Sequence, residues 1–296
     1  MVTRCGYDGA GMIDPKVLGN ALHHYRGRGY AVLRGVFAPD EVAEMAAAFD
    51  RQREAGLKYG ASFRHGNLLY RIGNDPAIGK IVRLVQWPSY QDPVLERYRR
   101  DPRFFEILSP ILGRDIKQII NQLHWKPPGA ASVDFAFHQD VRFRRPRAAY
   151  RNLEISYVQT GIAIDAHTKE SGAMRLLPYS HLRGELAIPA PAQILAGAPI
   201  DAALEAAGLN PAKLIDLELE AGDVALWSVL TVHGSTSNKT AGDRRFYLNG
   251  YVRASDCDRG EWAFRDGVPC PLGEPQLVHY EQLHERPEPH YVEEPS

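Results

Sequence analysis

The stretch FHQD at residues 137–140 is the one around which the rest of the chain can be organised. Successive side chains of a β-strand point to opposite faces, so a strand through this stretch presents His138 and Asp140 on one face. A second histidine, His233, closes the apolar run VALWSVLTV at residues 224–232. Two histidines and one carboxylate hold ferrous iron on one triangular face and leave its other positions open. The sequence therefore predicts a metal site built from His138, Asp140 and His233.

Neither half of this pattern is specific on its own. A His-x-Asp tripeptide arises often by chance and then forms an ordinary hydrogen-bonded pair. A histidine such as His233 at the end of a buried strand is equally compatible with a core histidine that binds no ligand. The metal site is favoured because both halves end apolar strands, where functional side chains are commonly presented. Strand alternation points Gln139 away from the pair, so we assign it no direct metal role.

On both sides of this stretch, the sequence predicts mainly short strands separated by turns. The 26 glycines and 21 prolines of the sequence fit such a pattern. We expect strands at residues 115–125, 135–141, 153–164, 172–177, 215–219, 224–233 and 246–252. This favours a mainly β fold with flanking helices, in the form of an antiparallel double-stranded β-helix, that is, a cupin-like jelly roll.

The N-terminal part, about residues 1–115, is expected to be largely helical. Val42, Met45 and Phe49 recur at helical spacing and predict an amphipathic helix over about 40–55. A second helix is expected over 92–109, a short one over 200–207, and strands over 30–37 and 61–72. No internal repeat or linker interrupts the sequence, so we expect one domain over 1–296, with a jelly-roll core at about 116–255 and a tail at 256–296.

Bulk composition narrows the class of partner. The formal net charge of the 296 residues is −1, so no general affinity for nucleic acid or an anionic membrane follows. The partner that we expect is a small-molecule substrate. The first residues lack the apolar core of a signal peptide. No run approaches the roughly 18 apolar residues of a membrane span. Three scattered cysteines do not make a disulfide framework, so a reducing cytoplasm is the expected location.

Several segments together resemble one known family. The run from His233 to Arg244, KPPG at 126–129, HQD at 138–140, residues 171–181 and the Gly222-Asp223 pair are similar to the signature of the phytanoyl-CoA dioxygenase family of iron(II)- and 2-oxoglutarate-dependent oxygenases. The matches span roughly residues 29–253. The resemblance implies Fe(II), 2-oxoglutarate as co-substrate and O2, with release of succinate and CO2. It also implies that His138, Asp140 and His233 are the iron ligands.

The same resemblance assigns a co-substrate clamp. Arg244 would bind the distal carboxylate of 2-oxoglutarate, because a guanidinium forms a bidentate, charge-assisted pair that an ammonium cannot match. Ser235 lies two residues past His233, so its hydroxyl could bond the same carboxylate. Arg245 is the alternative clamp, but strand alternation points it to the opposite face. Gln122 falls where the family points a residue into the pocket; a solvent-facing strand residue is equally compatible.

The sequence departs from the family pattern at one position and leaves the substrate open. Where many members carry a tryptophan that lines the co-substrate pocket, this chain has Gly161, so another side chain fills the space or the pocket is wider. Related halogenases lack the carboxylate, so Asp140 favours hydroxylation, while desaturation, epimerisation and ring formation stay open. A cluster after the iron pair either receives an anionic substrate group or forms a solvated basic loop: Arg142, Arg144, Arg145 and Arg147.

Three functions follow from these observations. The first is an oxygenase that uses 2-oxoglutarate to hydroxylate a small organic molecule. The arginine cluster would favour an anionic molecule as this substrate. The second is a cupin-type metalloenzyme without this co-substrate, and the third is a non-catalytic binding module on the same fold. Only the first needs Arg244 and Ser235 as a carboxylate clamp.

Overall fold

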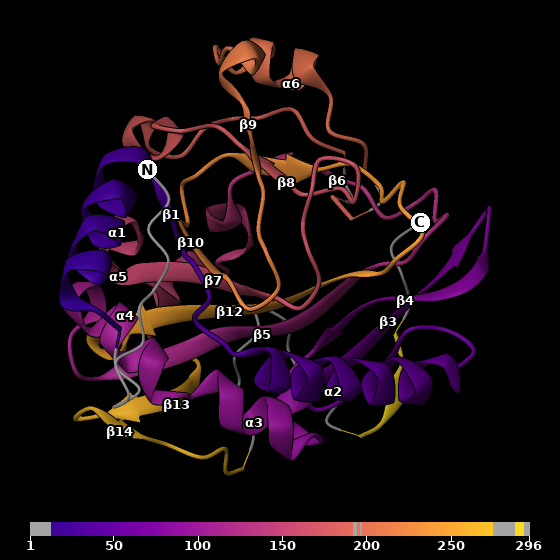
Figure 1. The fold of residues 1–296 in the computed structure, drawn as a ribbon, viewed down its shortest axis with the longest axis horizontal. Helices are drawn as coiled ribbons and strands as arrows, with labels where there is room; N and C mark the ends of the chain where they lie inside the picture. The colour runs from indigo at the N-terminus through magenta and orange to yellow at the C-terminus, as the bar shows by residue number, and fades with distance from the viewer. Residues whose placement is uncertain (1–12, 192–193, 196, 275–287, 293–296) are drawn as a thin grey trace.

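Two antiparallel β-sheets form most of the structure, a computed structural model that describes residues 13–191, 194–195, 197–274 and 288–292 (Figure 1). The larger sheet runs in the order β1 (Tyr30–Leu33), β10 (Val224–Ser228), β7 (Tyr157–Ala163), β12 (Arg244–Arg253), β5 (Ile116–Lys126), β4 (Gly79–Gln86), β3 (Leu68–Asp75), β2 (Phe63–His65) and β15 (His290–Tyr291), with β13 (Glu261–Arg265) on β5 and β14 (Val268–Pro269) on β13. The smaller sheet runs β6 (Phe135–His138), β11 (His233–Ser235), β8 (Met174–Leu176) and β9 (Ile215–Leu217). The mainly β class expected from the sequence is confirmed.

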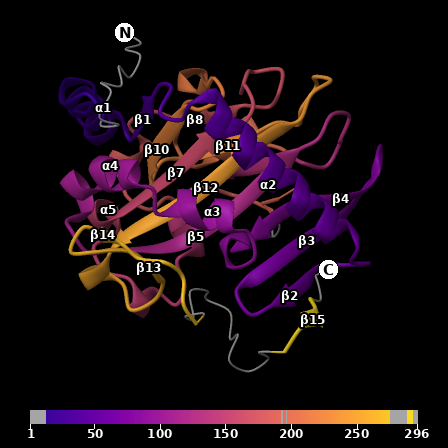
Figure 2. The same cartoon turned by 60° about the horizontal axis from the view of Figure 1, so that its bottom comes forward.

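The helices are α1 (Pro15–Arg28), α2 (Pro39–Leu57), α3 (Pro93–Arg99), α4 (Pro102–Leu112), α5 (Leu153–Ser156) and α6 (Asp201–Ala206), with 3-10 turns η1 (Pro88–Tyr90), η2 (Asp140–Phe143), η3 (Arg147–Ala149), η4 (Ser180–Arg183), η5 (Pro211–Lys213) and η6 (Ala254–Asp256). Helices α1 to α4 share a hydrophobic core with the larger sheet, whereas Leu204 of α6 packs with Phe137 of the smaller sheet (Figure 1). Figure 2 shows α2 lying across the sheet beside β3 and β4. Within the described ranges, no helix has both the length and the apolar composition to cross a bilayer.

The amphipathic pattern of α2 explains how the helical layer attaches to the sheet. Met45 and Phe49 are completely buried, and the Phe49 ring packs on Trp125 of β5 with 5.0 Å between ring centroids. The Glu41 side chain accepts a hydrogen bond from the Ala38 N–H at 2.8 Å and so stabilises the first turn. The predicted helix over 40–55 is therefore confirmed, and the short helix predicted over 200–207 is present as α6.

The run at 224–233 is not the single strand that the sequence predicts. β10 ends at Ser228, and a turn closed by the Thr231 N–H to the Ser228 carbonyl at 2.9 Å carries the chain into β11 of the other sheet. An apolar run is compatible with either arrangement, because both β10 and β11 are buried. The break matters for the site, since it puts His233 on the smaller sheet.

Three other elements also differ from the predictions made from the sequence. The strand over 135–141 ends at His138, and Asp140 begins η2. The strand over 153–164 begins as the short helix α5. The helix over 92–109 is two helices, because Asp101 caps a new one by accepting from the Arg103 N–H at 3.0 Å, and Pro102 follows as its first residue.

The N-terminal segment expected to be largely helical also supplies β1 to β4, and β4 was not expected. The tail from 256 supplies β13 to β15, which belong to the larger sheet. The domain boundaries stay a prediction.

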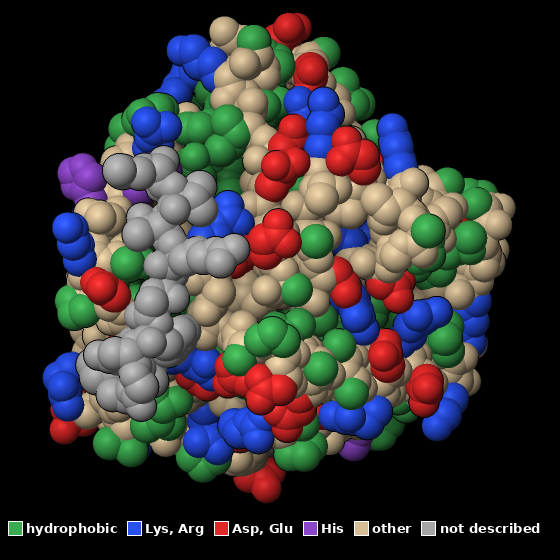
Figure 3. All heavy atoms as spheres, viewed as in Figure 1, with side chains coloured by type: hydrophobic (Ala, Val, Ile, Leu, Met, Phe, Trp, Pro, Cys, Tyr) green, Lys and Arg blue, Asp and Glu red, His purple; other side chains and the backbone are tan. Residues whose placement is uncertain are grey.

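On the face of the molecule in Figure 3, acidic and basic side chains are interspersed.

The Gly222-Asp223 turn joins the start of β10 to the chain that follows β1. The Asp223 carboxylate accepts from the Gly35 N–H at 2.8 Å and from Arg34 Nη1 at 2.5 Å. Gly222 has a φ of +90°, and a Cβ there would lie 2.3 Å from the Phe37 carbonyl oxygen. Only glycine satisfies both the left-handed backbone and the close backbone contact.

Replacing Gly222 with alanine should therefore lower the free energy of unfolding by about 1–3 kcal/mol. Urea denaturation followed by circular dichroism measures this change. Gly242→Ala is the matched control, because Gly242 is exposed and a Cβ there meets nothing within 4 Å. An unchanged unfolding midpoint in Gly222→Ala would contradict the role assigned to this turn.

Candidate active site

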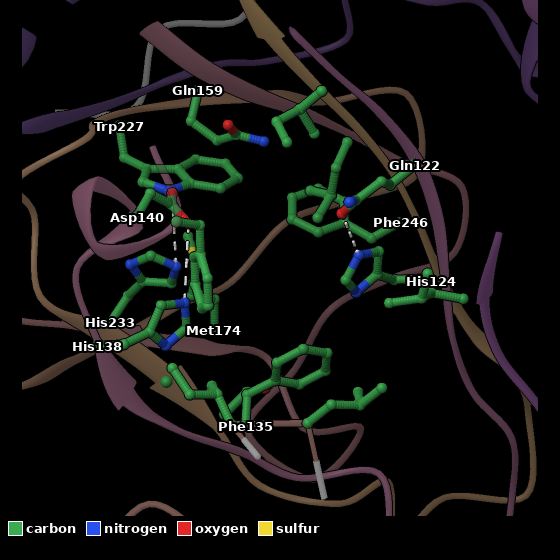
Figure 4. A pocket seen from close by; sticks show the side chains of 18 of the residues that line it. Gln122, His124, Phe135, His138, Asp140, Gln159, Met174, Trp227, His233 and Phe246 are labelled. Atoms are coloured by element: carbon green, nitrogen blue, oxygen red, sulfur yellow. Dashed lines mark hydrogen bonds and ion pairs between the residues drawn. The ribbon is translucent and has the colours of Figure 1, made fainter. Parts of the chain in front are cut away.

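A cavity of about 290 Å³ lies between the two sheets, and all three predicted metal ligands line it (Figure 4). The smaller sheet contributes Phe135, His138, Met174 and His233, and the larger sheet contributes Gln122, His124, Gln159, Trp227 and Phe246. In Figure 4 the histidine pair and Asp140 lie on one side of the cavity, and Gln122 and His124 on the other. The metal candidates therefore share one cavity with polar groups from the opposite sheet.

His138 and His233 come together because they are direct cross-strand partners in the pairing of β6 with β11. Their ring centroids are 4.3 Å apart. Asp140 reaches them from η2, which is anchored by the Val141 N–H donating to the Val229 carbonyl at 3.1 Å. The Asp140 carboxylate lies 3.8 Å from His138 Nε2 and 3.9 Å from His233 Nε2. One donor atom from each of the three residues lies within 4.8 Å of the others.

Backbone carbonyls fix the tautomer of both histidines. The Ala136 carbonyl lies 2.7 Å from His138 Nδ1, and the Thr231 carbonyl lies 3.0 Å from His233 Nδ1. A carbonyl only accepts, so each Nδ1 carries the proton and each Nε2 presents its lone pair to the cavity. This is the usual arrangement behind a metal-bound imidazole.

The charge states suit a divalent cation. Burial, followed by the charge of His233, lowers the pKa of His138 to about 3, so this imidazole is neutral at pH 7. Burial alone would raise the pKa of Asp140, but His233, His138 and Arg144 outweigh it, and the pKa of Asp140 is lowered. A neutral imidazole and an ionised carboxylate are the forms that coordinate metals.

Trp227 holds the Asp140 carboxylate in place. Its indole N–H donates to Asp140 Oδ2 at 3.0 Å, and its ring packs edge-on against His233. The hydrogen bond leaves Oδ1, the oxygen nearer to His138, available for a ligand bond. Sequence reasoning did not single out Trp227, because an aromatic residue in an apolar strand is typical of a core.

Arg244 is a buried cation with no acidic partner in the described part of the chain. It lines the cavity and is 4% exposed, and Nη2 donates to the Gly172 carbonyl at 2.8 Å. Among the described residues, no carboxylate forms an ion pair with Arg244, and its Nε has no hydrogen-bond partner. Burial lowers the pKa of Arg244 to about 10. Such a charge is costly to bury unless an anion binds it.

The guanidinium of Arg245 already forms an ion pair with another residue of this chain. Its Nε and Nη2 each lie 2.9 Å from an oxygen of Asp165, which forms a bidentate pair on the other side of the strand. Of the two candidates that the sequence left for a clamp, Arg244 is the one that faces the cavity.

Lys126 is a second buried cation here, and sequence reasoning missed it. It is directly opposite Arg244 in the pairing of β5 with β12 and is 0% exposed. Its Nζ donates to Ser235 Oγ at 2.7 Å and to the Thr236 carbonyl. Burial, and then the charge of Arg244, lowers the pKa of Lys126 well below its usual value. Because Lys126 occupies an acceptor position of Ser235, the hydroxyl proton of Ser235 remains for a ligand in the cavity.

Gln122 lines the cavity, which favours the first of the two interpretations left open by the sequence. Its Oε1 lies 3.0 Å from Nε2 of His124, a further lining residue that the sequence did not mark. Burial, followed by the charges of Arg244 and Lys126, lowers the pKa of His124 to about 3. His124 is therefore a neutral hydrogen-bond donor at pH 7.

Phe246 fills the space left by Gly161. A Cβ on Gly161 would lie 2.2 Å from Cζ of the Phe246 ring. The same ring stacks on Trp227 at a centroid distance of 6.1 Å. The sequence left two alternatives at Gly161, a wider pocket or another side chain in the same space. The structure shows the second.

The four arginines after the metal pair do not act as one cluster. Arg144 is buried and lines the cavity, whereas Arg145 and Arg147 are exposed. Arg147 pairs with Glu185 on the surface, and the guanidinium of Arg142 lies 5.8 Å from the centroid of the Phe143 ring. The structure therefore separates the buried Arg144 from the exposed Arg145 and Arg147, and whether any of the four binds substrate stays a prediction.

Comparison with known sequences agrees with this geometry. The model of the phytanoyl-CoA dioxygenase family (PhyH) matches residues 25–246. A probable alpha-ketoglutarate-dependent hypophosphite dioxygenase of Stutzerimonas stutzeri is 27% identical over 233 residues, which cover 78% of this chain and 77% of the relative. Dioxygenase lolE1 of Epichloe uncinata is 25% identical over 230 residues, covering 76% and 79%.

Solved structures share the fold. The epimerase SnoN, in complex with Fe3+, alpha ketoglutarate and nogalamycin RO, superposes with a TM-score of 0.60 at 21% identity, covering 89% of this chain and 98% of SnoN. EvdO2 of Micromonospora carbonacea var. aurantiaca, complexed with 2-oxoglutarate, gives a TM-score of 0.60 at 20% identity, covering 90% and 96%. The jelly-roll fold expected from the sequence is thereby confirmed.

Replacing Trp227 with phenylalanine tests the support of Asp140. The variant keeps an aromatic ring but loses the N–H donor, so its affinity for Fe(II), measured by anaerobic calorimetric titration, should fall by about 10-fold. Trp125→Phe is the control, because the Trp125 N–H is buried without a hydrogen-bond partner in the described structure. Equal affinities in the two variants would show that the Trp227 hydrogen bond does not orient a metal ligand.

Proposed function

Because this chain belongs to the phytanoyl-CoA dioxygenase family of iron(II)- and 2-oxoglutarate-dependent oxygenases, we propose that it hydroxylates a small molecule in the cavity between its two sheets. The enzyme is an oxidoreductase that uses Fe(II), 2-oxoglutarate and O2. Hydroxylation and the assignment of individual residues to roles are the parts that we propose. In this assignment His138, Asp140 and His233 hold the iron.

The observation that carries the proposal is the burial of Arg244 beside a three-residue metal site. A buried guanidinium that lines the cavity, whose Nε has no hydrogen-bond partner and which forms no ion pair with an acid in the described part of the chain, fits an anionic ligand. The distal carboxylate of 2-oxoglutarate supplies that anion. A cupin-type metalloenzyme without this co-substrate, or a non-catalytic module, has no need of such a cation.

In this proposal the residues around the site have separate roles in binding the metal and the co-substrate. Two imidazoles and one carboxylate match the ligand preference of ferrous iron and leave positions open for the co-substrate and oxygen. Arg244 and the Ser235 hydroxyl bind the distal carboxylate, Lys126 positions the Ser235 hydroxyl, and Gln122 lies across the cavity beside His124. The bound iron and co-substrate would supply the oxidising chemistry, while the apolar side chains of the cavity wall, including Phe246, limit the access of water.

We propose a small substrate. The cavity volume of about 290 Å³ is at the lower end of the range for ligand sites, about 300–1,000 Å³, and it must also hold the co-substrate. The relative named for hypophosphite is consistent with a compact substrate. We further propose that the enzyme works in the cytoplasm without a nucleic-acid partner, since its net charge is −1 and its two described cysteines are free.

His138→Ala tests the metal assignment. Wild-type protein prepared anaerobically with Fe(II) should develop a weak visible charge-transfer band when 2-oxoglutarate is added, and His138→Ala should lose it. His23→Ala, on the exposed side of α1, should keep the band. If the wild type forms no band and releases no succinate, the proposed function is wrong.

Arg244→Ala tests the clamp. Loss of a buried charge pair costs about 2–5 kcal/mol, so the dissociation constant for 2-oxoglutarate should rise on the order of 100-fold. Affinity for Fe(II) alone should change little, because Arg244 contacts none of the three metal candidates. Arg245→Gln, on the opposite face of the same strand, is the matched control and should bind 2-oxoglutarate normally. Similar losses of iron and co-substrate affinity in Arg244→Ala would contradict the clamp.

A further inference from the structure

Three glutamine side chains are among the described residues that line the cavity: Gln86, Gln122 and Gln159. Two of them have a partner for the amide oxygen. The oxygen of Gln159 accepts from the Tyr157 hydroxyl, and that of Gln122 lies 3.0 Å from Nε2 of His124. The amide oxygen of Gln86 is buried and has no hydrogen-bond partner in the described part of the chain. The cavity wall therefore contains one amide oxygen that still needs a donor.

The unpaired oxygen of Gln86 is unfavourable for the folded chain on its own. Gln86 is 7% exposed, so its oxygen has given up hydrogen bonds to water without gaining one from the protein. An apolar side chain of similar size would not carry this cost. The terminal torsion of glutamine is broad, so the amide can turn its edge toward the cavity that it lines. A ligand in that cavity can therefore supply the missing donor.

Gln86 of β4 and Gln122 of β5 are direct cross-strand partners. Side chains of such partners are neighbours on one face of a sheet, and both of these line the cavity. The oxygen of Gln122 accepts from the neutral His124 ring, and the Gln122 amide nitrogen donates to no other described residue. Gln86 and Gln122, the amide pair, thus present one acceptor and one donor side by side.

Apolar side chains surround the amide pair. Leu84 and Ile120 lie two residues before Gln86 and Gln122 on their strands, and Leu248 of β12 is directly opposite Gln122. All three line the cavity. A few polar groups in a mainly apolar wall are typical of sites that orient one polar group of a ligand.

The amide pair lies apart from the co-substrate clamp and from the metal candidates. Along β5, Gln122 precedes Lys126, the cross-strand partner of Arg244, by about 13 Å of strand at about 3.3 Å per residue. Figure 4 shows Gln122 across the cavity from the two histidines and Asp140. A molecule held by the amide pair can therefore extend toward the metal side without taking the place of the co-substrate on Arg244.

From this arrangement we propose that Gln86 and Gln122 bind a carboxamide group of the substrate. The Gln86 oxygen accepts from the N–H of this group, and the Gln122 amide nitrogen donates to its carbonyl oxygen. This inference rests on the proposed function, because it names the substrate class of that same site. A carboxylate or a ketone only accepts, so either one leaves the Gln86 oxygen without a donor. The enzyme therefore selects small amides over the matching acids and ketones.

The test uses the full chain with Fe(II) and saturating 2-oxoglutarate under anaerobic conditions. Propionamide, propionate and butanone, which have similar shapes and differ in the end group, are titrated separately by calorimetry. Propionate represents the competing ligand class, since Arg71 also lines the cavity. The wild type should bind propionamide at least 10-fold more tightly than either of the others. No preference for propionamide, or tighter binding of propionate or butanone, would overturn the proposal.

Gln86→Met assigns the preference to one residue. Methionine is unbranched and adaptable, so the variant keeps the packing and loses only the amide. It should bind propionamide at least 10-fold more weakly and butanone about as well as the wild type does. Its urea midpoint should be at least as high as that of the wild type, because the buried oxygen without a donor is gone. Gln91→Met, at an exposed glutamine outside the cavity, is the control and should keep the preference.

Two results with these variants would contradict the role of Gln86. One is a preference for propionamide that survives in Gln86→Met. The other is a lower urea midpoint in both Gln86→Met and Gln86→Leu, which would show that the amide serves the fold instead of a ligand. If the wild type forms no visible band with Fe(II) and 2-oxoglutarate, the proposed function is wrong. A band without an amide preference contradicts the amide pair alone.

Discussion

The register between β6 and β11 is the constraint on which the site depends, because it sets His138 directly opposite His233. A slip of one residue would turn one imidazole to the other face of the smaller sheet. The close approach of the strands relies on Gly234, where a Cβ would lie 2.8 Å from the Phe135 carbonyl oxygen. Two backbone carbonyls then orient the rings, and the Trp227 hydrogen bond orients Asp140. Geometry that is fixed before any ligand binds reduces the cost of assembling a metal site.

Two buried cations on the larger sheet explain why the cavity binds an anionic co-substrate. β5 and β12 place Lys126 opposite Arg244 with both side chains buried, which is an unfavourable cross-strand pair in a protein that binds no anion. The depressed pKa of Lys126 relieves part of the repulsion and leaves Arg244 as the permanent charge. A carboxylate ligand relieves the rest. The pairing of β5 with β12, two strands far apart in the sequence, thus creates the positive charge that binds the co-substrate.

Local sequence patterns predicted much of this arrangement. The helical spacing of Met45 and Phe49 located α2, and strand-end histidines together with the family resemblance located the three metal candidates. Other features depend on contacts that no local pattern records. The run at 224–233 gives no sign that a backbone turn moves it from one sheet to the other. A lysine before Pro-Pro-Gly suggests an exposed turn, and only the register with Arg244 shows that Lys126 is buried. Arg144 is distinguished from its neighbours by stacking on the ring of Tyr157.

A crystal structure of the protein grown anaerobically with Fe(II) and 2-oxoglutarate tests the central claim most directly. The account predicts an ion bound by Nε2 of His138, Nε2 of His233 and the Asp140 carboxylate, with the far carboxylate of the co-substrate on the Arg244 guanidinium. An ion bound elsewhere, or a co-substrate whose far carboxylate lies away from Arg244, would contradict it.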